Sequence, residues 1–327
     1  EMTSSLVGSE MCIRDRNKDI VINGIMGFII GDALGVPLEF KKRDLFKNNK
    51  VTDMISSDRI GAKGVWSDDS SMVIATMKSI IDNKGKINYE SIMDNFILWV
   101  SNKDFVAIDK AFGIGRATFF ALGNYHNKRY EKIIDCGMKG FNYNGNGSLM
   151  RILPIAYYCY YKKLNDDEIY HLVKDISSLT HSHEISVLGC FIYVLLVIEL
   201  LSGEEKENAY SNIKKYNYRK YFSLENIKYY DRLLNNDISK LGVDSISSMG
   251  FVVDTLEAVV WCFINNNSYD KCVIEAINLG NDSDTIGALV GGLSGIYYGN
   301  LPSKWLDSIV KKDYLLKLSN DYYNSIK

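Results

Sequence analysis

Apolar residues recur along this chain with helical spacing, in long segments that short polar stretches separate. Two of the segments, 19–35 and 285–299, also carry glycines three or four residues apart. Residues at these intervals share one face of an α-helix, although each glycine inside a helix costs about 1 kcal/mol relative to alanine. The glycine faces therefore predict either close packing between helices or direct contact with a ligand, and the pattern favours neither. The residues concerned are Gly24, Gly27, Gly31 and Gly35 in the first segment, and Gly287, Gly291, Gly295 and Gly299 in the second.

Further segments with helical periodicity are 70–81, 89–100, 154–161, 166–179, 186–201, 252–264 and 269–279. No run of alternating apolar and polar residues is bounded by hairpin turn signals, and no repeat of fixed period occurs. With only three prolines among 327 residues, long helices can continue without losing a backbone donor. The sequence therefore predicts an all-α, compact multi-helix fold that forms a single domain over residues 18–327, with segment 203–242 as surface helix and loop.

The apolar run 187–201 is the best candidate for a membrane-spanning segment. It has about 15 residues, whereas a bilayer core requires roughly 20. We therefore predict a buried core helix and no membrane association.

The N-terminus and the cysteines bear on the cellular compartment. Residues 1–17 lack the apolar core of a secretion signal, and part of this stretch, 5–16, resembles a translated adapter sequence. We expect residues 1–17 to be a non-native or disordered leader. The six cysteines form no CxxC pair, and a disulfide framework is not typical of a chain this long and apolar. We expect a reducing, cytoplasmic environment.

Charge and composition narrow the class of partner. The chain has 38 basic and 40 acidic residues, for a formal net charge of −2, and no basic stripe. Nucleic-acid binding depends on basic surface, so this balance argues against nucleic acid as the main partner. With 46% hydrophobic residues, a chain of this length can bury a large core. We expect a monomer.

Two short acidic clusters each directly precede an apolar helical segment. Taken singly, such residues are ordinary N-caps, and acids there favour the helix dipole. Together, four carboxylates with hydroxyl groups form an all-oxygen set of the kind that Mg²⁺ or Mn²⁺ prefers, and two such ions about 3.5–4 Å apart would need that many acids. The residues are Ser67, Asp68 and Asp69 in the first cluster, and Asp282, Asp284 and Thr285 in the second.

A further acid and two glycine-rich segments are weaker candidates. Glu39 follows the first glycine-bearing helix, where a side chain is either solvated or within reach of a shared site. In segment 145–151, glycines flank Asn and Ser, which suits a turn that offers backbone N–H groups to an anion such as a diphosphate; on its own, an ordinary turn is favoured. Arg151 either contacts phosphate or pairs with a buried carboxylate. Segment 113–118 lacks the strand context of a dinucleotide-binding fingerprint.

His181 and His183 directly precede an apolar helical segment. Such a pair can bind zinc, but no further His or Cys lies nearby to complete a tetrahedral site. A histidine here could instead stack on an adenine or cap the helix. Neither a G-x-S-x-G nucleophile motif nor a Walker A loop is present, so the candidate chemistry rests on the acids.

Taken in order, these motifs resemble those of the ADP-ribosylglycohydrolase family, which includes dinitrogenase-reductase-activating glycohydrolases and eukaryotic ADP-ribosyl-acceptor hydrolases. Each piece is weak by itself, whereas their joint order from about residue 24 to residue 302 is specific. The matching pieces are GDALGVPLEF (31–40), WSDDSSM (66–72), GIGRAT (113–118), GNGSLMRILP (145–154), TH (180–181), GFVVDTLEAVVW (250–261) and NLGNDSDTIGALVGGLSGIYYG (278–299).

The resemblance implies a central cleft that holds two Mg²⁺ ions, with Mn²⁺ as an alternative metal. It assigns metal ligation to Ser67, Asp68, Asp69, Asp282, Asp284 and Thr285, and catalytic roles to Glu39, Asp68, Asp69 and Asp284. It also places a set of residues against the ADP-ribose, namely Gly113, Gly115, Gly145, Asn146, Gly147 and Ser148 near the diphosphate and His181 near the adenosine. Two departures from the family pattern keep the ligand oxygens: Ser67 and Ser70 replace threonines, and Asn281 replaces a glycine.

The implied activity is Mg-dependent hydrolysis of the N- or O-glycosidic bond at ribose C1″ of an ADP-ribosylated protein or small molecule. A carboxylate would activate water, and the transition state would resemble an oxocarbenium ion, as for other glycosides. The alternative is a non-catalytic ADP-ribose-binding or immunity protein of the same fold, which would not need all of the acids. The motifs leave the acceptor open among arginine, serine, a nucleic-acid end and a metabolite.

Overall fold

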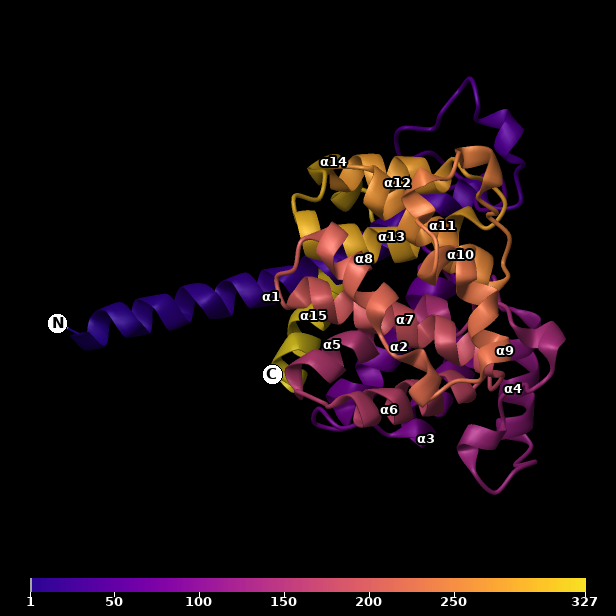
Figure 1. Ribbon diagram of the computed structural model, residues 1–327, viewed down its shortest axis with the longest axis horizontal. Coiled ribbons are helices and arrows are strands. Elements are labelled where there is room, and N and C mark those ends of the chain that lie inside the picture. The colour runs from indigo at the N-terminus through magenta and orange to yellow at the C-terminus, as the bar shows by residue number, and fades with distance from the viewer. Residues whose placement is uncertain (1) are drawn as a thin grey trace.

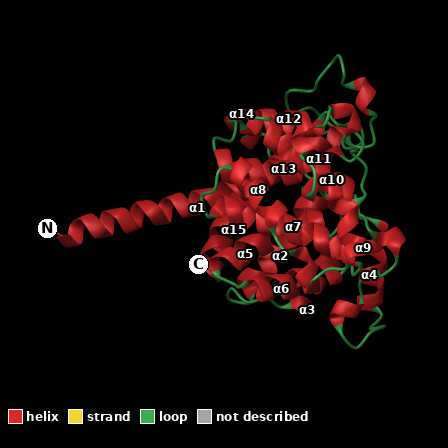
Figure 2. Ribbon diagram, viewed as in Figure 1, coloured by secondary structure: helices red, strands yellow, loops and turns green. Residues whose placement is uncertain are grey.

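The computed structural model describes the backbone of residues 2–327 and the side chains of residues 17–327. Within residues 2–327 the regular structure is helical and no β-strand occurs (Figure 2), so the predicted all-α class is confirmed. The expectation that residues 1–17 are a non-native or disordered leader falls on residues whose side chains, except that of Asn17, lie outside the described part of the chain. The longer helices are α1 Met2–Gly35, α2 Asp68–Asp82, α3 Tyr89–Asn102, α4 Arg116–His126, α5 Leu153–Tyr161, α6 Asp166–Ser178, α7 Glu184–Leu201, α8 Lys206–Lys215, α11 Val252–Asn265, α12 Tyr269–Ile277, α13 Ser283–Tyr298 and α15 Lys312–Ile326.

The two glycine-bearing helices, α1 and α13, pack directly against each other in the body of the protein (Figure 1). A β-carbon placed on Gly31 would lie 2.0 Å from the carbonyl oxygen of Gly287, and one on Gly27 would lie 2.5 Å from that of Gly291. These separations are far shorter than any real carbon–oxygen contact. The glycine faces therefore serve close helix packing, which brings the C-terminal end of α1 beside the N-terminal end of α13.

Helix α7 is the buried core helix predicted for the apolar run. By length and hydropathy, both α7 and the segment Asn17–Leu38 would suffice to cross a membrane, yet 83% of the apolar 18-residue stretch in each is buried inside the protein. Their side chains belong to one continuous cluster of buried residues that extends from Val21 to Ile326. This continuity supports our proposal that residues 18–327 form a single domain.

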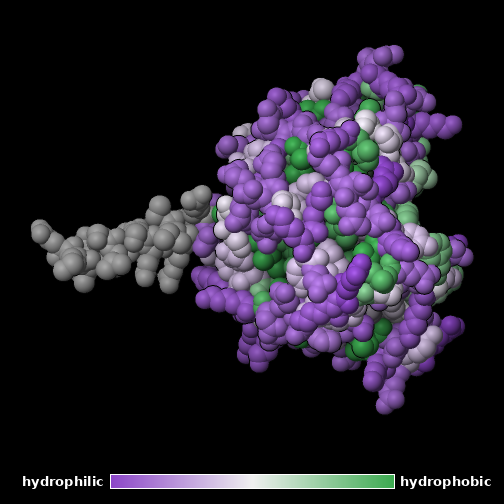
Figure 3. Space-filling model, in the orientation of Figure 1, coloured by the Kyte–Doolittle hydropathy of each residue, from purple (hydrophilic) through white to green (hydrophobic). Residues whose placement is uncertain are grey.

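Apolar side chains are gathered in the interior, and the face shown in Figure 3 is mostly hydrophilic, with only small separate hydrophobic areas. This distribution is expected when the hydrophobic effect drives folding. The cysteines with described side chains are all buried and free, as predicted; they are Cys136, Cys159, Cys190, Cys262 and Cys272. Cys12 lies outside the described side chains.

Two parts of the chain differ from expectation because tyrosine contributes to the core. Helix α15, which the apolar pattern did not predict, buries Tyr322 and Tyr323 together with its leucines and packs on α1 and α2. Segment 203–242 does contain α8, the short helices α9 (Leu224–Ile227) and α10 (Asp231–Leu234), and loops. It is not wholly a surface segment, because Tyr230 is fully buried and donates a hydrogen bond to the Ile185 carbonyl oxygen 2.8 Å away.

Candidate active site

A cavity of about 350 Å³ lies where the N-terminal ends of α2, α4 and α13 meet the C-terminal end of α1. Most of the site residues predicted from the sequence line it, although they come from segments far apart in the chain. Ser67 and Ser148 are the two exceptions among the predicted residues. Those that line the cavity are Glu39, Asp68, Asp69, Gly113, Gly115, Gly145, Asn146, Gly147, His181, Asp282, Asp284 and Thr285.

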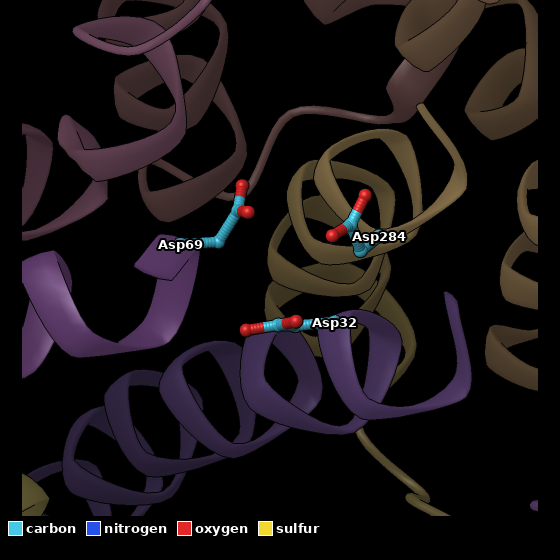
Figure 4. Close-up of side chains that lie close together, drawn as sticks. All are labelled: Asp32, Asp69 and Asp284. Atoms are coloured by element: carbon cyan, nitrogen blue, oxygen red, sulfur yellow. The ribbon is translucent and has the colours of Figure 1, made fainter. Parts of the chain in front are cut away.

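Three carboxylates from three different helices lie close together beside this cavity, and two of them, Asp69 and Asp284, line it. Asp32 on α1, Asp69 on α2 and Asp284 on α13 each direct an oxygen toward a common point (Figure 4), and these oxygens lie within 4.8 Å of one another. All three residues are buried. The two acidic motifs therefore do meet in space, and such a group of oxygens has the chemistry of a divalent-cation site.

Asp32 is the member of this group that the sequence analysis did not single out. Its carboxylate accepts hydrogen bonds from the backbone N–H groups of Ser67 and Ser70, at 3.0 and 3.1 Å, and from the Ser70 hydroxyl at 2.5 Å. It thus anchors the first turn of α2 to α1. The signal that would have found it is an acid inside the apolar part of a helical segment, 20–35, where a buried charge needs a specific partner.

Asp69 has one oxygen that is satisfied and one that is not. The Ser67 hydroxyl lies 2.9 Å from Asp69 Oδ2, and the Asp69 backbone N–H donates to the same hydroxyl at 3.2 Å. Ser67 therefore caps α2 and orients Asp69, although its hydroxyl does not line the cavity. Among the described residues, Asp69 Oδ1 is buried without any hydrogen-bond partner. Buried carboxylate oxygens are normally paired, so this oxygen is free to bind a hydrogen-bond donor or a cation.

Asp68 lies on the other side of the first turn of α2, against the glycine-rich segment that precedes α4. A β-carbon on Gly113 would lie 1.9 Å from Asp68 Oδ1, and Gly113 has a φ of +90°, which favours glycine. Gly113 is therefore required for Asp68 to occupy its position. Gly115 caps α4 and faces open space.

Asp282 forms the wall nearest the loop that precedes α11. Its Oδ2 accepts a hydrogen bond from the side-chain amide of Asn146, which also donates to the Thr255 hydroxyl at 2.9 Å. The backbone N–H of Asn146 donates to the Gly250 carbonyl oxygen at 3.1 Å. The N–H group of Asn146 is therefore already engaged, and its side chain positions an acid; the expectation that segment 145–151 offers N–H groups to an anion stays a prediction for its other residues.

Glu39 lies at the mouth of the cavity, where the segment after α1 is held by the loop before α13. The backbone N–H of Phe40 donates to the Asn281 carbonyl oxygen at 2.7 Å, and the N–H of Asn281 donates to Lys41 at 2.8 Å. Asn281 adopts a φ of +56°, which asparagine tolerates, so its replacement of a glycine preserves this turn. The Glu39 carboxylate accepts a hydrogen bond from Arg59.

The electrostatics of the acids reflect burial among like charges. Burial raises the pKa of Asp32 and that of Asp282 to about 6. Burial, with repulsion from neighbouring carboxylates, raises the pKa values of Asp68, Asp69 and Asp284 well above the ordinary range. So many neighbouring carboxylates cannot all be ionised in one buried cluster without a counter-charge. A divalent cation would supply that charge, and the unpartnered Asp69 oxygen fits the same requirement.

The cavity is also lined by His181, which lies beside Gly147 and is 2% exposed. A β-carbon on Gly147 would lie 2.8 Å from His181 Cε1 and 3.2 Å from the Thr118 hydroxyl oxygen. Ser148 does not line the cavity, and its hydroxyl lies within hydrogen-bond distance, 3.0 Å, of the Ser177 hydroxyl. Arg116 and Tyr143, which the sequence analysis did not single out, also line the cavity, and the guanidinium lies 5.3 Å from the ring centroid.

The structure gives Arg151 and His183 roles in packing and helix capping, which the sequence had left undecided. Among the described residues, Arg151 has neither a phosphate-facing position on the cavity nor a carboxylate partner; its guanidinium is buried and lies 5.2 Å from the Phe96 ring centroid. His183 caps α7, because its Nδ1 accepts the Ile185 backbone N–H at 3.3 Å.

Comparison with known proteins places the whole chain in one group. Residues 13–327 match the family model described as ADP-ribosylglycohydrolase. A solved structure titled ADP-ribosylglycohydrolase-related protein complex superposes with a TM-score of 0.78 at 23% identity, covering 96% of this chain and 100% of that one. At this identity the superposition establishes the fold.

Similar curated proteins carry related names. The ADP-ribosylarginine hydrolase Tri1 of Pseudomonas putida is 27% identical over 92% of this chain and 76% of its own length. The ADP-ribosyl-[dinitrogen reductase] glycohydrolase of Rhodospirillum rubrum is 24% identical over 90% of this chain and 91% of its own. The human ADP-ribosylhydrolase ARH3 is 23% identical over 74% of each.

Proposed function

Because the chain belongs to the ADP-ribosylglycohydrolase family, a family of glycosidic-bond hydrolases, we propose that it hydrolyses the bond at ribose C1″ of an ADP-ribosylated substrate with the help of a divalent cation. The observation that carries this proposal is the convergence of three buried carboxylates, those of Asp32, Asp69 and Asp284, of which Asp69 and Asp284 line the cavity. Among the described residues, one oxygen of Asp69 has no hydrogen-bond partner. Non-catalytic binding of ADP-ribose would not require such a costly group of acids.

The metal ligands in this proposal come from both acidic motifs. Asp69 and Asp284 are the strongest candidates by position, and Asp68, Asp282 and Thr285 border the same cavity. Oxygen donors of this kind suit Mg²⁺, and Mn²⁺ as the alternative; the number of acids suits two ions. Bound metal would offset the acidic charge and hold the ribose hydroxyl groups.

The chain's own groups supply proton transfer and orientation. Glu39, at the mouth, has a pKa raised by burial and partly lowered again by Arg59. A carboxylate whose pKa is raised toward neutrality is suited to accept a proton from an attacking water. We propose Glu39 or Asp284 as this base, while Asn146 holds Asp282 and Ser67 holds Asp69 in orientation.

We further propose that the acceptor is an arginine guanidinium. Tri1, which the chain resembles, is named an ADP-ribosylarginine hydrolase in two bacteria. The mouth of the cavity already receives a guanidinium, because Arg59 bonds to Glu39 and lies 5.1 Å from the Phe40 ring centroid. A carboxylate and an exposed aromatic ring together suit a planar cation.

The test is release of ADP-ribose from substrates modified on arginine or on serine, with Mg²⁺ or with EDTA. We expect turnover of the arginine-linked substrate that EDTA abolishes and Mg²⁺ restores. Turnover that persists in EDTA would contradict the metal-assisted mechanism. Preference for the serine-linked substrate would contradict the guanidinium acceptor, and absence of turnover with retained ADP-ribose binding would support the non-catalytic alternative.

A further inference from the structure

His181 reaches the cavity at the end of a buried chain of polar side chains. Arg151 Nη2 donates to the Thr180 hydroxyl oxygen at 2.8 Å, and the same oxygen lies 2.8 Å from His181 Nδ1. Arg151 and Thr180 are fully buried, and His181 is 2% exposed. None of these contacts involves Asp32, Asp69 or Asp284, so this series of hydrogen bonds is separate from the acidic cluster.

The donors and acceptors in this series of hydrogen bonds determine which ring nitrogen of His181 carries the proton. Arginine can only donate, so the Thr180 oxygen accepts from Arg151. The hydroxyl proton of Thr180 then has one acceptor within reach among the described residues, which is His181 Nδ1. A neutral imidazole that accepts at Nδ1 carries its proton on Nε2.

We propose that Arg151 and Thr180 are positioning residues that hold His181 in the neutral Nε2–H form, so that it presents one hydrogen-bond donor to an oxygen of the ligand. Among the described residues no group accepts from Nε2, while the ring lines the cavity beside Gly147. The Thr118 hydroxyl, which is buried and has no partner among the side chains of residues 17–327, borders the same spot. The two groups together suit a sugar hydroxyl or phosphate oxygen.

Two further observations agree with this arrangement. Burial, together with the nearby Arg151 charge, lowers the pKa of His181 to about 3, so the ring carries no charge at neutral pH. The backbone around the ring is also fixed. The His181 N–H donates to the Ser177 carbonyl oxygen at 2.7 Å, and the Ser177 hydroxyl donates to the His181 carbonyl oxygen at 2.9 Å. The imidazole is therefore set in place before any ligand arrives.

The first test is the tautomer itself, measured in the ligand-free protein by ¹⁵N NMR with labelled histidine. The chain has four histidines, so His181→Asn identifies the signal. We expect an unprotonated Nδ1 and a protonated Nε2 in the parent protein and in Thr180→Ser. Thr180→Val, which keeps the shape but removes the hydroxyl, should shift the signals toward the other tautomer or toward a mixture. A parent protein protonated on Nδ1, or an unchanged tautomer in Thr180→Val, would overturn the proposal.

The second test rests on the proposed function, because its probe is free ADP-ribose. Loss of one oriented donor should weaken binding by roughly three- to tenfold in Thr180→Val, while Thr180→Ser should bind like the parent. Equal weakening in both variants would indicate a packing effect and contradict the positioning role. If the parent does not bind ADP-ribose at all, the proposed function fails while the NMR result still decides the tautomer. If Thr180→Val does not fold, the spectrum of the parent protein decides it.

Discussion

Arg59 donates a hydrogen bond to the Glu39 carboxylate at the mouth of the acidic cavity, and the Glu39 side chain is only 9% exposed whereas that of Arg59 is half exposed. The pair therefore joins a nearly buried acid, Glu39, to a more exposed cation, Arg59, which a ligand could displace. Burial raises the pKa of Glu39, and the Arg59 charge opposes that rise.

Replacement of Arg59 by alanine should shift the acidic limb of the pH–activity profile to higher pH. Without the guanidinium, the pKa of Glu39 rises further, so the ionised form that accepts a proton appears only at higher pH. The measurement is kcat/KM against pH in saturating Mg²⁺. Arg59→Lys retains a positive charge and should leave the limb nearer its original position. An unmoved limb in Arg59→Ala would indicate that Glu39 is not the titrating base.

Asp284→Asn should abolish most of the turnover. A carboxamide cannot supply the negative charge that offsets a divalent cation, and loss of metal assistance is worth several kcal/mol, or more than about a hundredfold in kcat. Asp32→Asn should cost less, roughly 10- to 100-fold, because Asp32 mainly anchors the residues that carry the ligands. Metal affinity is measured alongside kcat by titration of the EDTA-treated protein. Unchanged affinity for Mg²⁺ in Asp284→Asn would show that this acid is not a ligand.

Arg116→Ala should raise KM for the ADP-ribosylated substrate by roughly five- to tenfold, with kcat nearly unchanged. Arg116 is exposed and lines the cavity with Tyr143, so it can attract a diphosphate without taking part in bond cleavage. Arg129 offers a matched control, since it lies on the adjoining surface beyond Tyr143. An equal effect of Arg129→Ala would point to general charge attraction.

Gly31→Ala should destabilise the protein by about 3 kcal/mol or more, because its β-carbon would overlap the Gly287 carbonyl group. Gly123→Ala is the matched control in α4, where a β-carbon meets nothing within 4 Å. That substitution should be neutral or stabilise by up to about 1 kcal/mol. Urea unfolding monitored by circular dichroism gives both values. Similar stabilities for the two variants would contradict the close approach of α1 and α13.

Glu257→Gln should make the protein more stable at pH 8 by about 1–2 kcal/mol, with little change at pH 5. Burial raises the pKa of Glu257 to about 7 despite its ion pair with Arg232 at 3.5 Å. A raised pKa means that the folded state holds the proton more tightly than the unfolded chain. The stability from the neutral acid is complete below about pH 4.5 and is lost as the pH rises through 7. Glutamine cannot ionise, so the gap between the two proteins should widen over this window in thermal unfolding. A constant gap from pH 5 to pH 8 would exclude this ionisation.

The local patterns of the sequence determined most helices and the two acidic motifs. Helical spacing of apolar residues predicted α7 and α11 closely. The order of residues along a helix fixes which of its faces are apolar and can be buried. The same reasoning gave N-capping as the ordinary role of residues in the acidic clusters, and Ser67 does cap α2, since capping is a local interaction. It failed for α15 and for segment 203–242, where buried tyrosines contribute to the core although their hydroxyl groups make them appear polar.

Only the tertiary structure decided which of these residues meet. The order of motifs predicted that the acids would share a site, yet it did not reveal that Asp32 joins Asp69 and Asp284, or that Ser148 does not line the cavity. It also left the role of the glycine faces undecided between ligand contact and helix packing. The close approach of α1 and α13, which leaves no room for a β-carbon on Gly27 or Gly31, decided for packing. The reason is physical: a helix propensity or a cap depends on neighbours in the chain, whereas a shared site depends on contacts between residues far apart in the sequence, such as Asp32 and Asp284.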